Sequence, residues 1–401
     1  MARPITSHRT VVAVATTVLI LVACGGGSGF GGDGGGGGDQ AEGGMELELM
    51  AYTSSPAEDA ELQGIIDAYN EQSDNDATLN IVPEYDTTLQ AALAGGDPPD
   101  VFYLNDQRLP DLVEAGALAP AEGQVENDDD FYPSLRDAFT YDGTFWCPPK
   151  DFSTLALQYD PDALAAAGID PPTTWDELAR AAEALTTPDR VGLVIGAEYP
   201  RWGAFIFGAG GSVTTEDYAE MTIDSAEVRT ALEFLRDLHA DGFARTASEL
   251  DAGWPGEAYA QGKAAMTIEG NWIIGFLRND FPDREWAVAE LPSGPAGPAT
   301  MAFTVCYAVS ANAANPDASW DLVNFLVGAE QQLEYTRQFP VMPSRQSITE
   351  EWLAANADLE PFIAGADYAH PFQFAPGFQG VLDTLNDGIQ GMPPGPGRST
   401  T

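Results

Sequence analysis

Flat aromatic rings and planar polar groups stand together in stretches that the sequence predicts as loops at the ends of strands and helices. The run 105–108 (Asn-Asp-Gln-Arg) follows the apolar run 101–104, and Trp202 and Trp254 lie in two further stretches of this kind. An indole ring is a flat apolar platform, whereas amide, carboxylate and guanidinium groups form hydrogen bonds in fixed directions. These side chains suit the binding of a small molecule that has both flat apolar faces and polar groups.

Catalytic and metal-binding patterns are weak by comparison. His239 and His370 are isolated, and no His or Cys cluster has the spacing of a metal site, so we expect no cofactor. A glycoside hydrolase needs two carboxylates across the scissile bond. With 62 acidic residues such a pair could occur anywhere, and no signature marks one. An extracellular carbohydrate-active enzyme therefore stays a lesser alternative.

The charge distribution argues against a nucleic-acid partner. The net charge is −45, and Lys150 and Lys263 are the two lysines. Contacts to phosphates need a basic surface, which this chain does not offer. The acidic residues are spread along the whole sequence, and such a surface repels itself at low ionic strength and is relieved by salt. It suits either a saline habitat or an acidic exported protein from an ordinary one.

Hydrophobic periodicity predicts strands and helices in alternation. The expected strands are 46–50, 79–82, 101–104, 191–195, 264–268 and 302–309. The expected helices are 57–71, 87–94, 109–115, 161–167, 174–184, 226–239, 272–277, 318–327 and 330–338. Thr174 and Glu177 form a capping box, which makes Trp175 a structural residue. The alternation favours an α/β fold, and the roughly 355 residues after position 44 suit two lobes.

The N-terminus has the features of an export signal. A weakly basic leader precedes the apolar run 11–23, which is shorter than the roughly 20 residues of a membrane-spanning helix. Small residues before Cys24 resemble the cleavage box of bacterial lipoproteins, in which the cysteine is acylated. We therefore expect a signal peptide at 1–23, and a lipidated Cys24 with a glycine-rich tether at 24–44. The alternative is an ordinary signal peptide with a chance cysteine.

Four segments carry a resemblance to a known family. They read PDVFY at 99–103, GIDPPTTWDEL at 168–178, QGKAAMTIEGNW at 261–272, and NPDASW at 315–320 with FL at 325–326. In this order they resemble the extracellular solute-binding proteins of the sugar-binding class, the receptors of ATP-driven importers that include maltose-binding proteins. The segment at 261–272 is the most specific, and the resemblance covers nearly the whole mature chain.

The resemblance implies a two-lobed, periplasmic-binding-protein-like α/β fold with crossing hinge strands and a ligand cleft between the lobes. Lobe one would comprise 45–153 plus 304–340, and lobe two 154–303 plus 341–401, with crossings near 151–155, 301–305 and 340–343. Members of the family usually continue with a further C-terminal helix. Here prolines and glycines fill residues 393–397, so that helix is expected to be missing or replaced.

The resemblance also assigns candidate ligand contacts. Trp272 matches a position that stacks on a sugar ring, and Trp202 lies in a loop that faces the cleft in the family. Asp106 and Arg108 match positions that form hydrogen bonds with sugar hydroxyls. Lesser candidates are Asn105, Ser54, Trp146 and Phe378. The alternatives are core packing for the aromatic residues and a solvated loop for the polar ones.

Two cysteines remain if Cys24 is lipidated. Cys147 and Cys306 fall beside the predicted hinge strands, which are neighbours in the family, and export permits a disulfide. We expect a bond between them; the alternative is two free buried cysteines.

The expected function is that of an extracellular receptor that closes around a sugar or oligosaccharide and delivers it to the permease of an ATP-driven importer. It would be a monomer, held at the outer face of the cell membrane by its lipid alone. The alternatives are the same scaffold with a non-sugar ligand such as glycerol phosphate or a polyamine, and a surface adhesion protein.

Overall fold

The computed structural model describes residues 44–52, 56–215, 220–338, 341–372 and 378–391. The chain divides into two units, residues 1–42 and 43–401, and every described element belongs to the second. The expected signal peptide, Cys24 and Ser54 lie outside the described residues. None of the described helices combines the length and the hydropathy that crossing a membrane requires.

A single mixed sheet of twelve strands forms the frame of the second unit. Its main path runs in the order β2-β1-β3-β12-β7-β10-β8-β9, with β4, β11, β13 and β14 paired beside it. The strands are β1 (Glu46–Ala51), β2 (Asp76–Ile81), β3 (Val101–Asn105), β4 (Leu118–Ala119), β7 (Pro149–Tyr159), β8 (Val191–Val194), β9 (Ala244–Arg245), β10 (Ala264–Gly270), β11 (Ala287–Ala289), β12 (Thr300–Ser310), β13 (Met342–Pro343) and β14 (Ala369–Pro371). A separate hairpin joins β5 (Thr140–Tyr141) to β6 (Thr144–Phe145).

Fifteen described helices surround these strands. They are α1 (Pro56–Gln72), α2 (Tyr85–Gly95), α3 (Leu109–Glu114), α4 (Pro133–Ala138), α5 (Pro161–Ala167), α6 (Trp175–Leu185), α7 (Tyr199–Gly208), α8 (Ala226–Ala240), α9 (Pro255–Ala260), α10 (Trp272–Asp280), α11 (Pro316–Leu326), α12 (Ala329–Gln338), α13 (Thr349–Ala355), α14 (Glu360–Ala364) and α15 (Gln379–Gln390). Short 3-10 turns join several of them, including Asp106–Arg108 directly after β3.

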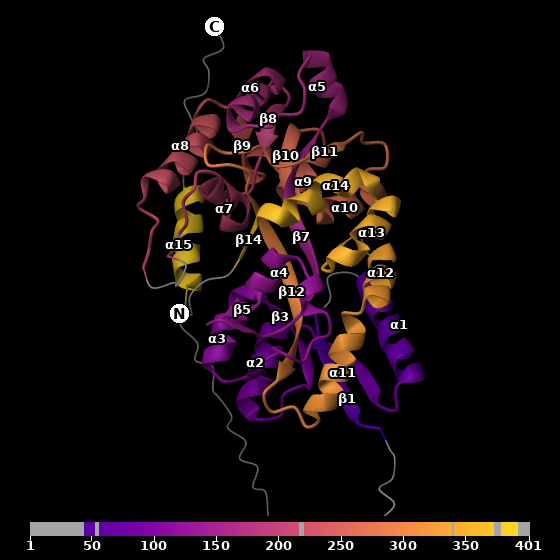
Figure 1. Cartoon of the computed structure of the whole chain (residues 1–401). Helices are drawn as coiled ribbons and strands as arrows, with labels where there is room; N and C mark the ends of the chain where they lie inside the picture. The colour runs from indigo at the N-terminus through magenta and orange to yellow at the C-terminus, as the bar shows by residue number, and fades with distance from the viewer. Residues whose placement is uncertain (1–43, 53–55, 216–219, 339–340, 373–377, 392–401) are drawn as a thin grey trace, which may run out of the picture. The chain divides into compact units, whose positions relative to one another are not determined.

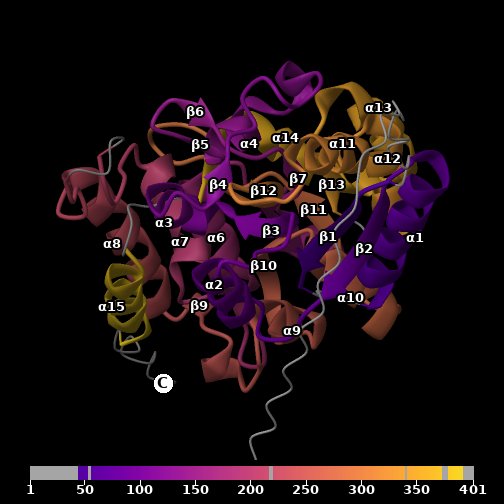
Figure 2. The same cartoon turned by 90° about the horizontal axis from the view of Figure 1, so that it is seen from below.

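The first half of the sheet is a parallel β2-β1-β3 arrangement. Leu47 and Leu49 of β1 are buried with Leu62 and Ile66 of α1, because the apolar face of that helix turns toward the strands. Figure 2 shows α1 beside β1 and β2. The later helices α11 and α12 return to this half and contact α1, so one core contains segments far apart in the sequence.

Two long strands join the halves. β12 pairs with β3 through 305–309 and with β7 through 302–306, while β7 goes on to pair with β10 through 155–159. β13 adds a third segment against β7. Figure 1 shows β7 and β12 running through the middle of the unit between its two groups of elements. Any site beside these strands is therefore reached from both halves.

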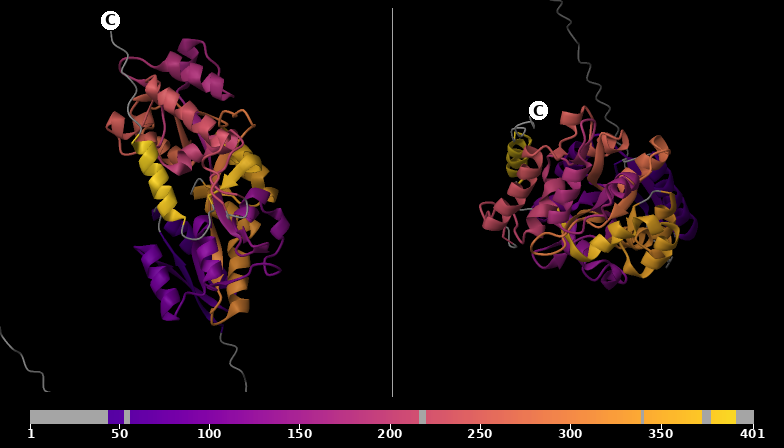
Figure 3. Two further views of the ribbon diagram at one scale, coloured as in Figure 1. Left: turned by 90° about the vertical axis from the view of Figure 1, so that its left-hand side faces the viewer. Right: turned by 90° about the horizontal axis from the view of Figure 1, so that it is seen from above.

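The second half holds β10, β8 and β9 with α5 to α10 around them. The buried residues form two clusters, one under α6, α7 and α8 and one under α9, α10 and the later helices α13 and α14. The C-terminal helix α15 packs on α7 (Figure 3). It ends at Gln390, and residues 393–397, where the family's further helix is expected to be missing or replaced, lie outside the described residues.

The disulfide between Cys147 and Cys306 is present, so that prediction is confirmed. The two Cα atoms lie 5.7 Å apart, and both side chains are buried beside the junction of β7 and β12. The bond links positions 159 residues apart.

Most expected elements are present, and their ends differ by a few residues. Thr174 caps α6 as predicted, since its hydroxyl accepts a hydrogen bond from the Glu177 amide at 3.3 Å. The main difference is the segment 198–203, which was expected as a loop. It forms the start of α7, with Pro200 in the first turn, where its missing N–H costs nothing.

Candidate ligand-binding site

A pocket of about 320 Å³ lies beside the two long strands that join the halves. Its walls come from β1, α1, β3, β7, α10 and β12 and from segments near the C-terminus. The lining residues are Tyr52, Glu58, Tyr103, Asn105, Asp106, Gln107, Lys150, Asp151, Ser153, Trp272, Phe303, Thr304, Val305, Val341 and Phe372. The pocket combines aromatic side chains with a larger number of polar and charged ones, a lining that can hold a polar small molecule.

The aromatic rings lie on two sides of the pocket. Tyr52 meets the Tyr103 ring edge-on, with ring centroids 5.4 Å apart, on the wall from the first half. Trp272 meets Phe303 in the same manner at 5.3 Å on the other wall. Trp272 is 37 % exposed, whereas nearly all large apolar residues of the described chain are buried or half-buried. A ligand would therefore find one open indole surface ready to stack on.

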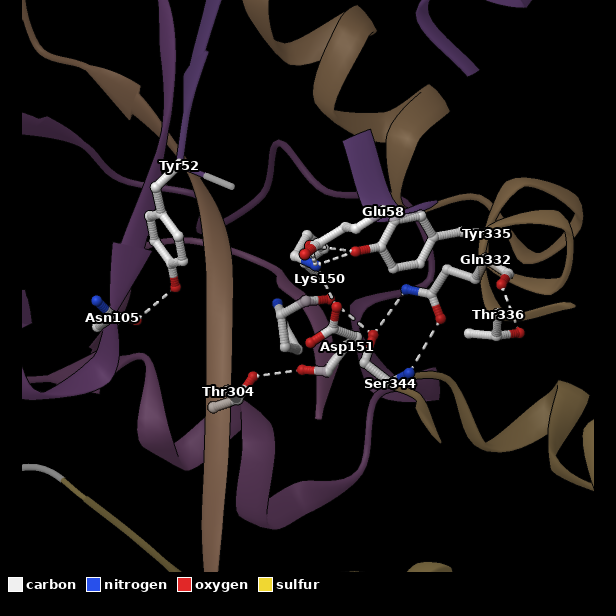
Figure 4. Close-up of polar contacts among 11 residues, drawn as sticks. Tyr52, Glu58, Asn105, Lys150, Asp151, Thr304, Gln332, Tyr335, Thr336 and Ser344 are labelled. Atoms are coloured by element: carbon white, nitrogen blue, oxygen red, sulfur yellow. Dashed lines mark hydrogen bonds and ion pairs between the residues drawn. The ribbon is translucent and has the colours of Figure 1, made fainter. Parts of the chain in front are cut away.

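A buried charged cluster closes the pocket floor (Figure 4). Lys150 donates to Glu58 at 3.1 Å, to Tyr335 at 2.6 Å and to Asp151, and Tyr335 in turn donates to Glu58. Burial raises the pKa of Asp151, although Lys150 counteracts it. Burial would lower the pKa of Lys150, but the negative charges of Asp151 and Glu58 outweigh it and raise that pKa. The lysine therefore stays charged.

Ser344 and Thr304 attach this floor to the neighbouring strands (Figure 4). Ser344 donates to the Pro149 carbonyl at 2.6 Å and accepts from Gln332 at 2.7 Å. The Thr304 hydroxyl donates to the Asp151 carbonyl at 2.7 Å. The floor is thus fixed to β7, β12 and α12 at once.

Asp106 lines the pocket and is only 3 % exposed. Its carboxylate accepts from the Gln107 amide at 2.9 Å and from the Phe372 amide at 2.8 Å. Burial raises the pKa of Asp106 to about 7, although the backbone donors counteract part of the effect. Beside it, Asn105 accepts a hydrogen bond from the Tyr52 hydroxyl at 3.1 Å. Asp106 therefore ties the end of β3 to the segment after β14.

A second hollow of about 550 Å³ adjoins this pocket, since the two share Tyr52 and Asn105. Tyr85 and Glu84 line it together with Asp86, which forms an ion pair with Arg108. A ligand longer than one ring has room to extend in this direction.

Three of the candidate contacts predicted from sequence meet at the pocket: Trp272, Asp106 and Asn105. Arg108 does not line it. It forms an ion pair with Asp86, which lines the neighbouring hollow.

The remaining aromatic candidates lie in the cores. Trp202 is 1 % exposed and packs on Tyr199 with ring centroids 4.9 Å apart; it borders a separate cavity of about 260 Å³ under α8 and α15. Trp146 is half-buried in the first core and donates to the Tyr141 carbonyl at 3.1 Å. Phe378 is buried at the start of α15 in the second half.

Sequence reasoning missed several lining residues. Tyr52 lies two residues before Ser54, so the loop after the first strand was the right region. Lys150 stands out as one of two lysines in the chain, and this rarity was a usable signal. Phe303 and Phe372 gave none, because an aromatic residue in or beside a strand is most often core.

Among the described residues, no group of three or more His, Cys, Asp or Glu side chains could hold a metal ion. The pocket offers hydrogen bonds and aromatic surface for binding.

The comparisons with known proteins agree with this geometry. The profile of the family described as bacterial extracellular solute-binding protein matches residues 64–361. Because this match spans most of the sequence, the chain belongs to the bacterial extracellular solute-binding proteins. Its two-lobed α/β fold is that of the oligosaccharide-binding members whose structures it resembles.

Three relatives illustrate the similarity. A binding protein of Brucella abortus is 24% identical over 333 residues, which cover 79% of this chain and 80% of that protein. The maltotriose-binding protein of Pyrococcus abyssi is 25% identical over 260 residues, 63% of this chain and 55% of the relative. The acarbose-binding GacH receptor of Streptomyces glaucescens superposes with a TM-score of 0.75 at 25% identity, covering 87% of this chain and 93% of the receptor.

Proposed function

We propose that this protein is the receptor of an ATP-driven importer and that it binds a sugar or oligosaccharide in the pocket beside β7 and β12. The observation that carries the proposal is that the partly exposed indole of Trp272 lines the same pocket as the planar polar side chains of Asn105, Asp106 and Gln107. A sugar ring presents a flat C–H face to such an indole and hydroxyls to such a wall. Relatives named for maltotriose and acarbose support the same ligand class.

The charges in the pocket favour a neutral ligand over a phosphorylated one. Lys150 is the one cationic side chain in the described lining, and an ammonium group has three N–H donors. Glu58, Asp151 and Tyr335 take all three. A phosphate would therefore meet carboxylates with no donor available from the lysine. Glycerol phosphate is accordingly a poor candidate.

A polyamine is the second candidate ligand. Three carboxylates, those of Glu58, Asp106 and Asp151, line the pocket and would attract ammonium groups. Against it, two of the three already pair with Lys150, and burial favours the neutral form of Asp106 near pH 7.

The mechanism we propose is closure of the lobes around the ligand. Lobe one would comprise 45–153 plus 304–340 and lobe two 154–303 plus 341–401, with β7, β12 and β13 as the connections. A ligand that contacts both walls binds the closed arrangement better than the open one, and so shifts the population toward it. The permease of the importer would recognise the closed form, and the ligand would leave unchanged, without catalysis.

The setting we propose is the outer face of the cell membrane. The description of the family as extracellular supports export, and the Cys24 box supports a lipid anchor with residues 25–44 as tether. We propose that the protein acts as a monomer.

A thermal-shift screen of the full chain tests the ligand class. Mono- and oligosaccharides, glycerol 3-phosphate and spermidine are compared in high salt. A ligand that binds only the folded protein raises its midpoint by mass action, so we expect a shift with sugars alone. A shift with spermidine or glycerol phosphate and none with any sugar would overturn the proposed class.

A further inference from the structure

The indole of Trp272 is held in place from three sides. Trp272 is the first residue of α10, directly after the end of β10, and its side chain is one of few large apolar groups exposed in the described chain. An exposed aromatic side chain at a chain turn would ordinarily move among rotamers. Its indole N–H donates to Glu269 at 2.9 Å, and this hydrogen bond fixes the ring in one orientation.

Glu269 is itself rigidly placed and completely buried. Its backbone amide donates to the Gln158 side chain at 3.0 Å, and the same side chain donates back to the Glu269 carbonyl at 3.0 Å. Burial raises the pKa of the Glu269 carboxyl, and the positive charge of Arg201 counteracts that effect. A carboxylate in such a place needs a partner to stay ionised.

Arg201 of α7 is that partner, and it also contacts the indole. Its guanidinium donates to Glu269 through Nε at 3.3 Å and through Nη2 at 2.9 Å. The guanidinium carbon lies 5.1 Å from the centroid of the Trp272 ring, within the range of a cation–π contact. Neither Arg201 nor Glu269 lines the pocket, so both act on a ligand only through Trp272.

Gly270 provides the space in which the ring lies. A Cβ atom at Gly270 would fall 2.1 Å from Cζ3 and 2.3 Å from Cη2 of Trp272, so any larger residue would displace the ring. The glycine is not in the left-handed region, and backbone strain therefore does not explain it.

A buried ion pair is weak support for stability, because an apolar replacement is often as stable. The geometry here points to another role. We propose that Glu269, Arg201 and Gly270 are positioning residues that preset the indole of Trp272 as a rigid platform for the sugar. This inference rests on the proposed function for its ligand, but the orientation of the ring is measurable without one.

The experiment labels the tryptophans of the full chain with 5-fluorotryptophan and records 19F spectra. The chain has eight tryptophans, and the Trp272 resonance is assigned by its loss in Trp272→Phe. Two variants change the support in different ways: Glu269→Gln removes the charge of the hydrogen-bond acceptor, and Gly270→Ala leaves the ion pair intact but occupies the space under the ring. We expect both to shift the Trp272 resonance and to weaken binding of the sugar found in the screen by about tenfold.

Gly256→Ala is the matched control. A Cβ there would lie 2.1 Å from Cζ3 of Trp254, so the same substitution displaces a tryptophan that does not line the pocket. It should move the Trp254 resonance and leave both the Trp272 resonance and the sugar affinity unchanged. Thermal unfolding of each variant shows that the chain is folded when it is measured.

The outcomes distinguish the positioning of the Trp272 ring from the proposal that the ligand is a sugar. An unchanged Trp272 resonance and an unchanged affinity in both folded variants would overturn the positioning role, even if the wild type binds sugar. A Trp272 resonance that moves in Glu269→Gln and Gly270→Ala supports the positioning of the ring even if no sugar binds, in which case the proposed ligand class alone is lost.

Discussion

The two sides of the pocket are built on different principles. The side from the first half includes the charged floor, whose hydrogen bonds are satisfied internally because Lys150 donates to Glu58, Asp151 and Tyr335. The wall from the second half carries a partly exposed apolar surface, the ring of Trp272, which is 37 % exposed. Because the donors of Lys150 are all used within the protein, the first side excludes ligands that need them. The exposed aromatic surface on the other side supplies contact area. Selectivity and affinity are therefore expected to come from opposite sides.

The difference also separates stability from binding. Breaking a buried charged cluster leaves uncompensated charges, so its loss should appear in the free energy of unfolding. Removing a partly exposed ring leaves the core intact, so its loss should appear in the affinity. The variants below separate the effect of the charged cluster on stability from the effect of Trp272 on ligand affinity.

The largest effect should come from the disulfide at the junction of β7 and β12. Opening it in Cys147→Ser/Cys306→Ser releases a loop of 159 residues, which costs about 5 kcal/mol of stability in the chain-entropy model. Denaturant unfolding of the oxidised wild type and the double variant measures it. Two equally stable proteins would show that the bond does not restrain the unfolded chain.

Next comes Lys150→Met in the charged floor. It leaves Glu58 and Asp151 buried without their cation, and we expect a loss of about 3–5 kcal/mol in the free energy of unfolding. Lys263→Met is the control, since that lysine bonds only the Leu250 and Asp251 carbonyls near the surface and should cost about 1 kcal/mol or less. Equal losses would contradict a special role of the cluster.

Asp106, which links the two walls, should make stability depend on pH. Its pKa is raised to about 7 by burial, so between pH 4 and pH 7 the folded state keeps a proton that the unfolded state has lost. Stability should therefore fall as pH rises through this window, by up to about 4 kcal/mol from this group. Asp106→Asn has no titratable carboxyl group at this position, so this pH dependence should be absent from the variant. From pH 4 to pH 8, the free energy of unfolding of the variant should therefore rise relative to that of the wild type, as measured by denaturant unfolding. A difference in unfolding free energy that does not change with pH would mean that burial does not raise the pKa of Asp106.

Much of the fold follows from the sequence, because its signals are local. Helices α6 and α8 have clear periodicity, strand β10 is a short apolar run, and all three begin within one residue of the expected position. The disulfide needed the pairing of β7 with β12, which only the resemblance supplied. The lobe boundaries stay a prediction.

The binding residues were harder to predict than the fold, as two tryptophans show. Trp202 and Trp272 were both expected at the cleft, yet Trp202 lies on the buried side of α7 and Trp272 at the exposed start of α10. Composition does not distinguish them, since burial depends on how α7 packs against residues near the C-terminus. Lys150 and Tyr335 are 185 positions apart, and only the fold brings them together.

The most direct test of the account is a calorimetric titration of the sugar found by the screen into the wild type and into Trp272→Ala. The account predicts a clear affinity for the wild type and a loss of about 2 kcal/mol, roughly thirtyfold, in a variant that remains folded. Binding of equal strength in both proteins would contradict it, because the ligand would then not rest on the one open ring of the pocket.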